Sequence, residues 1–98
     1  MIRSALTVAG LDPSGGAGIA ADLKVFNALG VHGMVVASSL TAQNTQRVEG
    51  VYAVNGGVFE RQLAVLLDDI IPAALKTGVL CNAELVEILI STIKKYKL

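Results

Sequence analysis

The sequence of 98 residues contains little charge and a single cysteine. Charged residues make up 16% of the chain, against about 25% in typical globular domains. Eight Lys and Arg residues balance eight Asp and Glu residues, whereas a surface that binds nucleic acid needs an excess of positive charge. We therefore expect no nucleic-acid partner. Cys81 has no second cysteine to pair with, which excludes an internal disulfide, and we expect it to be a buried thiol.

Long apolar runs and a leader are also missing. No stretch approaches the roughly 18 uninterrupted apolar residues of a membrane-spanning helix, and the amino terminus lacks the layout of a signal peptide. We expect no membrane partner and a cytoplasmic location. Apolar residues nevertheless make up 53% of the chain, although a domain this short has a large surface for its volume. We therefore expect a homo-oligomer, or the inner part of something larger.

Apolar runs and helical repeats alternate along the whole chain, with no linker or internal repeat between them. The expected strands cover 4–9, 34–38, 51–54 and 73–77, and the expected helices cover 19–29, 59–70 and 82–93. Strands that alternate with helices and are continuously apolar indicate a parallel sheet buried on both faces. The sequence therefore predicts one α/β domain over residues 1–98, with a parallel sheet between two helical layers.

A glycine-rich turn, G-L-D-P-S-G-G-A-G at 10–18, follows the first expected strand. Ligands of open parallel sheets bind at this place, beyond the strand ends and near helix starts, and glycines allow close approach of the backbone. The turn is not a P-loop, because Gly16 and Ala17 replace the required Lys and Ser or Thr. Residues 16–21 fit a dinucleotide fingerprint, but no acidic residue lies between Asp22 and Glu49 to hold a ribose.

Asp22 lies on the apolar face of the expected helix. At 100° per residue it falls between Phe26 and Leu29, and a buried carboxylate needs hydrogen-bond donors. Two interpretations stay open. Asp22 binds backbone N–H groups or a core partner near the helix start, or it lines a ligand site at the rim of the sheet, where it accepts from a ring amine or a hydroxyl.

An uncharged polar run, S-S-L-T-A-Q-N-T at 38–45, follows the second expected strand. Such side chains at the end of a buried strand either bind a neutral polar ligand or form an ordinary solvated loop. His32 follows Gly30 and Val31, and we expect it in a turn rather than in a catalytic role.

Four segments carry a more specific signal: A-G-L-D-P-S-G-G-A-G-I-A-A-D-L-K at 9–24, F-N-A-L-G-V-H-G at 26–33, L-T-A-Q-N-T at 40–45 and K-T-G-V-L at 76–80. In this order and spacing they resemble the amino-terminal part of hydroxymethylpyrimidine/phosphomethylpyrimidine kinases, a thiamine-biosynthesis family of the ribokinase-like superfamily. The resemblance covers essentially the whole chain.

This resemblance implies a ribokinase-like fold and ATP-dependent, Mg²⁺-assisted phosphorylation of 4-amino-5-hydroxymethyl-2-methylpyrimidine and then of its monophosphate. Carried over by position, it implies that the pyrimidine substrate is bound by the following residues: Gly10, Ala17, Asp22, Gln43 and Val79. The family often has Met where this chain has Val79.

The resemblance also implies that the nucleotide pocket, the anion hole and the catalytic base lie outside the 98 residues. No residue of this chain is expected to be catalytic, and we expect the chain to be inactive alone. Two alternatives stay open: a pyridoxine or pyridoxal kinase of the same superfamily, and a non-catalytic module that binds the pyrimidine.

Overall fold

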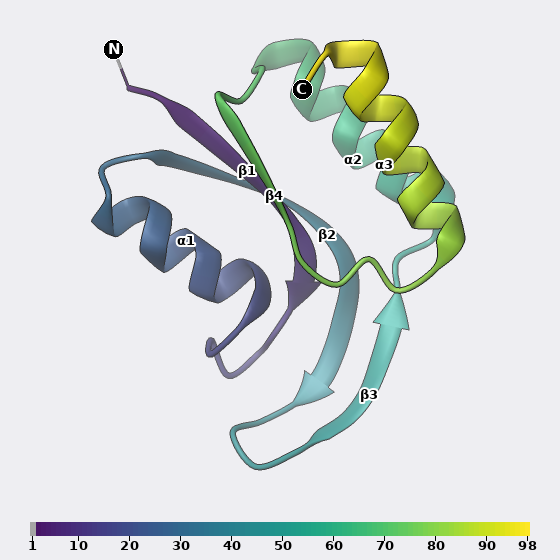
Figure 1. The fold of residues 1–98 in the computed structure, drawn as a ribbon. Helices are drawn as coiled ribbons and strands as arrows, with labels where there is room; N and C mark the ends of the chain where they lie inside the picture. The colour runs from purple at the N-terminus through teal and green to yellow at the C-terminus, as the bar shows by residue number, and fades with distance from the viewer. Residues whose placement is uncertain (1) are drawn as a thin grey trace.

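The computed structural model describes residues 2–98 and contains one mixed sheet between helices. Its elements are β1 (Ser4–Leu11), α1 (Gly18–Ala28), β2 (His32–Gln43), β3 (Val48–Ala53), α2 (Gly56–Asp69), β4 (Ala74–Thr77) and α3 (Ala83–Tyr96). The strand order is β3-β2-β1-β4, and β1 is parallel to both β2 and β4. Helix α1 covers one face, and α2 and α3 cover the other (Figure 1). The predicted three-layer α/β architecture is confirmed.

The prediction of a wholly parallel sheet is wrong at β3, which runs antiparallel to β2. The two strands are joined by residues 44–47 only, and a parallel pair needs a crossover of a dozen residues or more. Asn44 closes this turn, because its Oδ1 accepts from the backbone N–H groups of Gln46 and Arg47 at 2.8 and 3.0 Å. The loop interpretation of the polar run is therefore wrong for residues 38–43, because β2 continues to Gln43 and pairs with β3, and only residues 44 and 45 of the run lie in the turn.

The main core lies between the sheet and the α2–α3 layer. Leu6 and Val8 alternate along β1 and are both fully buried, as expected for one face of a strand. They belong to a cluster with Met34, Val36, Phe59, Leu63, Leu67, Leu85 and Leu89. The alternation leaves Thr7 on the opposite face, under α1.

Helix α1 packs less completely than its sequence predicts. Ile19 is buried, whereas Leu29, expected on the apolar face, is 71% exposed at the end of the helix. The helix approaches β2 at Gly33, where a Cβ atom would lie 2.8 Å from the Leu23 side chain and 3.0 Å from that of Phe26. Close packing of α1 therefore depends on the missing side chain at Gly33.

Helix α3 begins as predicted, because the Asn82 side chain accepts a hydrogen bond from the backbone of Leu85. Two expectations for single residues are wrong. Cys81 is exposed, with φ at 74°, because it lies in the loop between β4 and α3 rather than in the core. His32 begins β2 instead of lying in a turn, and it is exposed there.

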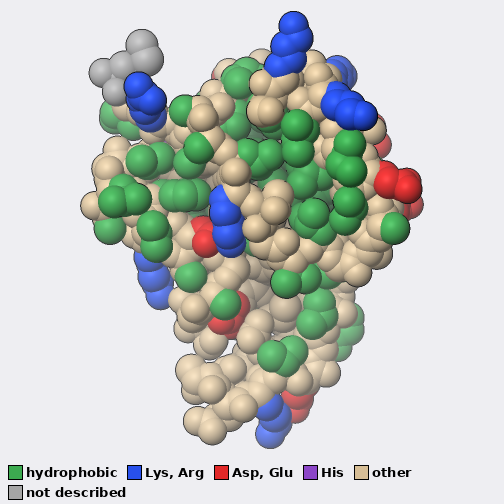
Figure 2. Space-filling model, in the orientation of Figure 1, with side chains coloured by type: hydrophobic (Ala, Val, Ile, Leu, Met, Phe, Trp, Pro, Cys, Tyr) green, Lys and Arg blue, Asp and Glu red, His purple; other side chains and the backbone are tan. Residues whose placement is uncertain are grey.

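Several large apolar side chains stay exposed. They include Val79 at 63% and Ile90 at 47%, and hydrophobic side chains gather on the face of the molecule along which β4 and α3 lie (Figure 2). This exposure accounts for the apolar excess in the composition. Among residues 2–98, no helix has the length and apolarity to cross a bilayer.

Candidate functional site

A pocket of about 270 Å³ lies at the carboxyl ends of the three parallel strands. The ends of β1 and β2 and the start of α1 come together at one side of the sheet (Figure 1). The lining residues are Gly10, Leu11, Asp12, Ala17, Gly18, Ser39, Thr41, Gln43, Val48, Val51, Lys76, Gly78 and Val79. Ligands of open α/β sheets bind at such a place, so this pocket is the candidate site.

A bulge in β2 determines which side chains of this strand line the pocket. Ala9 pairs with Ala37, but Gly10 pairs with Ser39, so Ser38 is an extra residue. The insertion shifts the alternation of the strand by one position. Ser39 therefore lies beside Gly10, and Thr41 and Gln43 follow at intervals of two on the same face. All three line the pocket.

The glycine turn is held by Asp12, which is buried. Its carboxylate accepts from the backbone N–H and the hydroxyl of Ser14, at 2.8 and 2.6 Å, and from the backbone N–H of Gly16 at 3.1 Å. The hydrogen bond from the Ser14 hydroxyl, aided by those from the backbone, lowers the pKa of Asp12 against the raising effect of burial. Lys24 braces the same turn by donating to the Gly15 carbonyl at 2.9 Å. The hydrogen bonds of the Asp12 carboxylate thus stabilise the glycine turn.

Asp22 is placed at the rim of the pocket rather than in its lining. Its Oδ2 atom accepts from the Thr7 hydroxyl at 2.6 Å and from the Lys76 ammonium at 2.8 Å. Burial raises the pKa of Asp22, but the hydrogen bonds from Lys76 and Thr7 and the charge of Lys76 outweigh it, so the pKa lies below its usual value. Lys76 does line the pocket, so Asp22 fixes the position of a cationic side chain there.

Two adjacent serines of β2 have different environments. The Ser38 hydroxyl donates to the backbone carbonyl of Val79, which joins β2 to the end of β4. The Ser39 side chain is 1% exposed, and its Oγ atom has no hydrogen-bond partner among residues 2–98. A Cβ atom on Gly10 would lie 2.6 Å from this Oγ. A residue larger than glycine at position 10 would therefore collide with the Ser39 side chain.

The structure brings together four of the five residues predicted to bind the substrate: Gly10, Ala17, Gln43 and Val79 line one pocket. Asp22 is separated from the lining and pairs with Lys76, one of the core-partner arrangements that the sequence left open. Whether these residues bind a pyrimidine stays a prediction.

Sequence reasoning missed the parts played by Asp12 and Lys76, and it included Ser39 and Thr41 only as members of the polar run at 38–45. The D-P-S segment, which is typical of a turn in which Asp accepts from the following backbone, was a signal for Asp12. No sequence pattern indicated the bulge in β2. No pattern indicated the pairing of Lys76 with Asp22 either, because the two residues are 54 positions apart.

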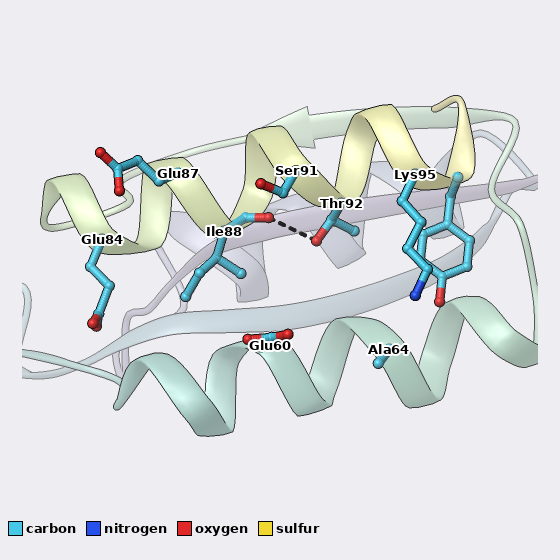
Figure 3. Close-up of a pocket in the computed structure, with 9 residues that line it drawn as sticks. Glu60, Ala64, Glu84, Glu87, Ile88, Ser91, Thr92 and Lys95 are labelled. Atoms are coloured by element: carbon cyan, nitrogen blue, oxygen red, sulfur yellow. Dashed lines mark hydrogen bonds between the residues drawn. The ribbon is translucent and has the colours of Figure 1, made fainter.

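A second hollow, of about 310 Å³, lies on the surface between α2 and α3 (Figure 3). Several of its polar groups are already engaged. The Thr92 hydroxyl donates to the Ile88 carbonyl at 2.8 Å, and the Lys95 ammonium lies 5.3 Å from the centre of the Tyr96 ring. None of the predicted site residues line it, so it is not the candidate site.

The pocket suits one small ring better than a nucleotide with metal. Lys76 is the one Lys or Arg among its lining residues, and no group of three or more metal-ligating side chains occurs within residues 2–98. A triphosphate with Mg²⁺ therefore does not fit these residues, whereas an uncharged ring with polar edges does.

Residues 12–98 match the family model described as phosphomethylpyrimidine kinase. The chain is 45% identical over 94 residues to the hydroxymethylpyrimidine/phosphomethylpyrimidine kinase of Staphylococcus aureus strain Mu50, covering 96% of this chain and 33% of that protein. It is 42% identical over 95 residues to the enzyme of the same name from Escherichia coli K12, covering 97% of this chain and 36% of that protein. The chain thus spans about a third of the length of these curated relatives.

Solved structures of two kinds of kinase share the fold. A phosphomethylpyrimidine kinase from Clostridium difficile 630 matches with a TM-score of 0.93 and 42% identity, over 97% of this chain and 41% of that one. A Bacillus subtilis pyridoxal kinase, solved as an ADP complex, matches with a TM-score of 0.92 and 37% identity, over 100% of this chain and 39% of that one. The predicted ribokinase-like fold is confirmed for the amino-terminal part that this chain covers.

Proposed function

Because the chain belongs to the phosphomethylpyrimidine kinase family, we propose that it is the substrate-binding part of a thiamine-pathway kinase. The substrates are 4-amino-5-hydroxymethyl-2-methylpyrimidine and its monophosphate, with ATP and Mg²⁺ as the phosphate donor and its metal. The relatives named hydroxymethylpyrimidine/phosphomethylpyrimidine kinase support this assignment.

The observation that carries the proposal is the pocket at the carboxyl ends of β1, β2 and β4. Its volume of about 270 Å³ suits a single substituted ring. Gly10 and Gly18 present backbone at one wall, and Val48 and Val51 supply apolar surface at another. A flat, uncharged heterocycle fits between backbone and apolar side chains, and its polar edges meet Gln43 and Lys76.

In this proposal each polar residue has a separate task. The Gln43 amide binds one edge of the ring. Lys76, held by Asp22, which itself accepts from the Thr7 hydroxyl, presents its remaining N–H groups at the rim of the pocket. Lys76 is 47% exposed along its side chain, so it can reach an oxygen of the hydroxymethyl group or of the monophosphate. Asp22 lies outside the lining of the pocket and acts through Lys76.

Phosphate transfer itself is assigned to no residue of this chain. Phosphoryl transfer requires cationic groups and metal ions around the moving phosphate, and one lysine lines this pocket. The chain spans about a third of its relatives. We expect the 98-residue chain to form no phosphorylated product from the pyrimidine, ATP and Mg²⁺, as measured by mass spectrometry. Detection of product with repeated turnover would contradict this.

Pyridoxal is the second candidate substrate, because pyridoxal kinase structures share the fold, among them the Staphylococcus aureus enzyme solved with AMP-PCP and pyridoxal, at 34% identity and a TM-score of 0.87. Both compounds are substituted six-membered rings with a hydroxymethyl group. The candidates therefore need to be separated by measurement.

Isothermal titration of the chain with the hydroxymethylpyrimidine and with pyridoxal tests the proposal. We expect the pyrimidine to bind more tightly, and we expect Gln43→Ala to weaken its binding about tenfold through loss of the ring-edge hydrogen bond. Gln46→Ala is the matched control, because Gln46 lies in the exposed turn after β2 and does not line the pocket. Tighter binding of pyridoxal would favour the second candidate, and binding of neither compound would overturn both.

A further inference from the structure

Gln43 is the end of a short chain of hydrogen bonds with a fixed direction. The Thr41 hydroxyl donates to the Leu11 carbonyl at 2.8 Å, and the Gln43 side-chain nitrogen Nε2 lies 2.8 Å from the same hydroxyl. These two hydrogen bonds connect the last residue of β1 to the last residue of β2 along the wall of the pocket.

The donor and acceptor in each of these two hydrogen bonds follow from the number of protons that the Thr41 hydroxyl can donate. A carbonyl oxygen can only accept, and a threonine hydroxyl has one proton to donate. Since the Thr41 proton goes to Leu11, the hydroxyl can only accept from Gln43. The amide of Gln43 must therefore point its NH₂ group toward Thr41. Reversing the amide would place two acceptor oxygens against each other and lose a hydrogen bond.

The other end of the amide is free to meet a ligand. Gln43 lines the pocket and is partly buried, and its Oε1 atom has no hydrogen-bond partner among residues 2–98. With Nε2 turned toward Thr41, Oε1 is the atom presented away from it. The protein thus offers an acceptor of fixed orientation at this edge of the pocket.

We propose that Thr41 is a positioning residue that fixes Gln43 as a hydrogen-bond acceptor, so that the site selects a ring with an N–H donor at that edge. This inference rests on the proposed function, because it names the substrate feature that the same pocket recognises. An exocyclic amine on the ring is such a donor. A ring with only an acceptor at that edge leaves the Gln43 Oε1 atom unpaired. A site binds such a ring much more weakly, because one of its own polar groups then loses its hydrogen-bond partner.

The first test needs no ligand. Hydrogen exchange of the Gln43 side-chain amide, followed by NMR, is compared in the wild type, Thr41→Ser, Thr41→Val and Thr41→Ala. We expect slow exchange of one amide proton in the wild type and in Thr41→Ser, which keeps the hydroxyl, and faster exchange in the other two. Thr41→Val has the shape of threonine and suits a strand, and Thr41→Ala provides a second variant without the hydroxyl. Equal exchange in all four proteins would overturn the proposed contact.

The second test measures selectivity. The 4-amino-5-hydroxymethyl-2-methylpyrimidine and the analogue without the amine are titrated into the same proteins, and the ratio of their Kd values is compared. We expect the ratio to fall about tenfold in Thr41→Val and to be kept in Thr41→Ser, because one hydrogen bond orients the amide. Thr45→Val, in the exposed turn after β2, is the control for a lost hydroxyl elsewhere.

The outcomes separate the two proposals. If the wild type binds the aminopyrimidine and Thr41→Val keeps the full ratio, Thr41 does not set the selectivity, although the proposed function stands. If the wild type binds neither compound, the proposed function fails together with the selectivity assigned to Gln43. The exchange measurement then still decides whether Thr41 orients the amide.

Discussion

The side chain of Gln62, on α2, forms two hydrogen bonds with the main chain of Ala37, on β2. Its Oε1 atom accepts from the Ala37 N–H at 3.0 Å, and its Nε2 atom donates to the Ala37 carbonyl at 3.0 Å. β3 pairs with β2 only from Ser39 onward, so Ala37 has no strand beside it on that edge. Gln62 takes the place of the missing strand.

Gln62→Leu is therefore expected to destabilise the fold by about 1–3 kcal/mol, because it leaves a partly buried N–H group and a partly buried carbonyl of Ala37 without partners. Urea unfolding at neutral pH measures this change. Arg61→Ala, an exposed neighbour on the same helix, is the control and is expected to change the free energy of unfolding by less than about 0.5 kcal/mol. Equal stability of Gln62→Leu and the wild type would contradict the prediction.

Asp22 links stability to pH. Its pKa is lower in the folded chain than the ordinary value of 3.8, so its contribution is complete above that pH and is lost as the pH falls through the folded pKa. At pH 6 we expect Asp22→Asn to lower the free energy of unfolding by about 1 kcal/mol, a modest figure because Lys76 is half exposed and solvent screens the pair. The difference from the wild type should shrink below about pH 4.

Lys76→Met and the double variant complete a mutant cycle for this pair. We expect a coupling free energy of about 1 kcal/mol at pH 6 and a smaller one at pH 3. A coupling that does not change with pH would show that the charge of Asp22 is not what holds Lys76.

The two serines at the β2 bulge should respond oppositely to the same substitution. Ser38→Ala loses the hydrogen bond to the Val79 carbonyl and is expected to cost about 1 kcal/mol. Ser39→Ala removes a buried hydroxyl without a partner, so it should be neutral or stabilising by up to about 1 kcal/mol. Thermal unfolding of both variants side by side provides the measurement, and a larger loss for Ser39→Ala would be contrary to it.

Gly18 and Gly30 offer a matched pair of glycines with positive φ, at 59° and 72°. A Cβ atom on Gly30 meets nothing within 4 Å, whereas one on Gly18 would collide with the Gly10 carbonyl. We expect Gly30→Ala to cost about 1 kcal/mol from the backbone alone and Gly18→Ala to cost about 3 kcal/mol or more. Chemical unfolding distinguishes these costs, and equal values would mean that the turn relaxes around the new atom.

The element order could be predicted because each segment carries its own periodicity. Continuous apolar runs indicated the three parallel strands, and Asn82 indicated the start of α3. The direction of β3 follows from the short connection at 44–47, which the sequence does not reveal, because the expected strands end at 38 and begin again at 51. Pairing between two half-exposed strands leaves no continuous apolar signal in the polar run.

The candidate site could be predicted less well, for reasons of geometry. The family resemblance alone implied Gly10, Ala17 and Gln43 as binding residues, and the structure places them around one pocket. The partner of Asp22 could not be found, since Lys76 approaches it only when β4 lies beside β1. Helical periodicity correctly indicated that the carboxylate needs donors, but it could not say which residues supply them.

The extra residue in β2 has a consequence for length variation in this part of the chain. Removing Ser38 would leave Ser39 opposite Gly10 and Leu40 opposite Leu11, so every later residue would stay on its present side of the strand. A deletion between Ser39 and Gln43 has no extra residue to absorb it, so the residues after it would turn over to the other side. The amide of Gln43 would then point away from the cavity, and the sheet would keep its pairing but lose the polar side chain at that edge. The number of residues between Ser39 and Gln43 therefore matters as much as their identity.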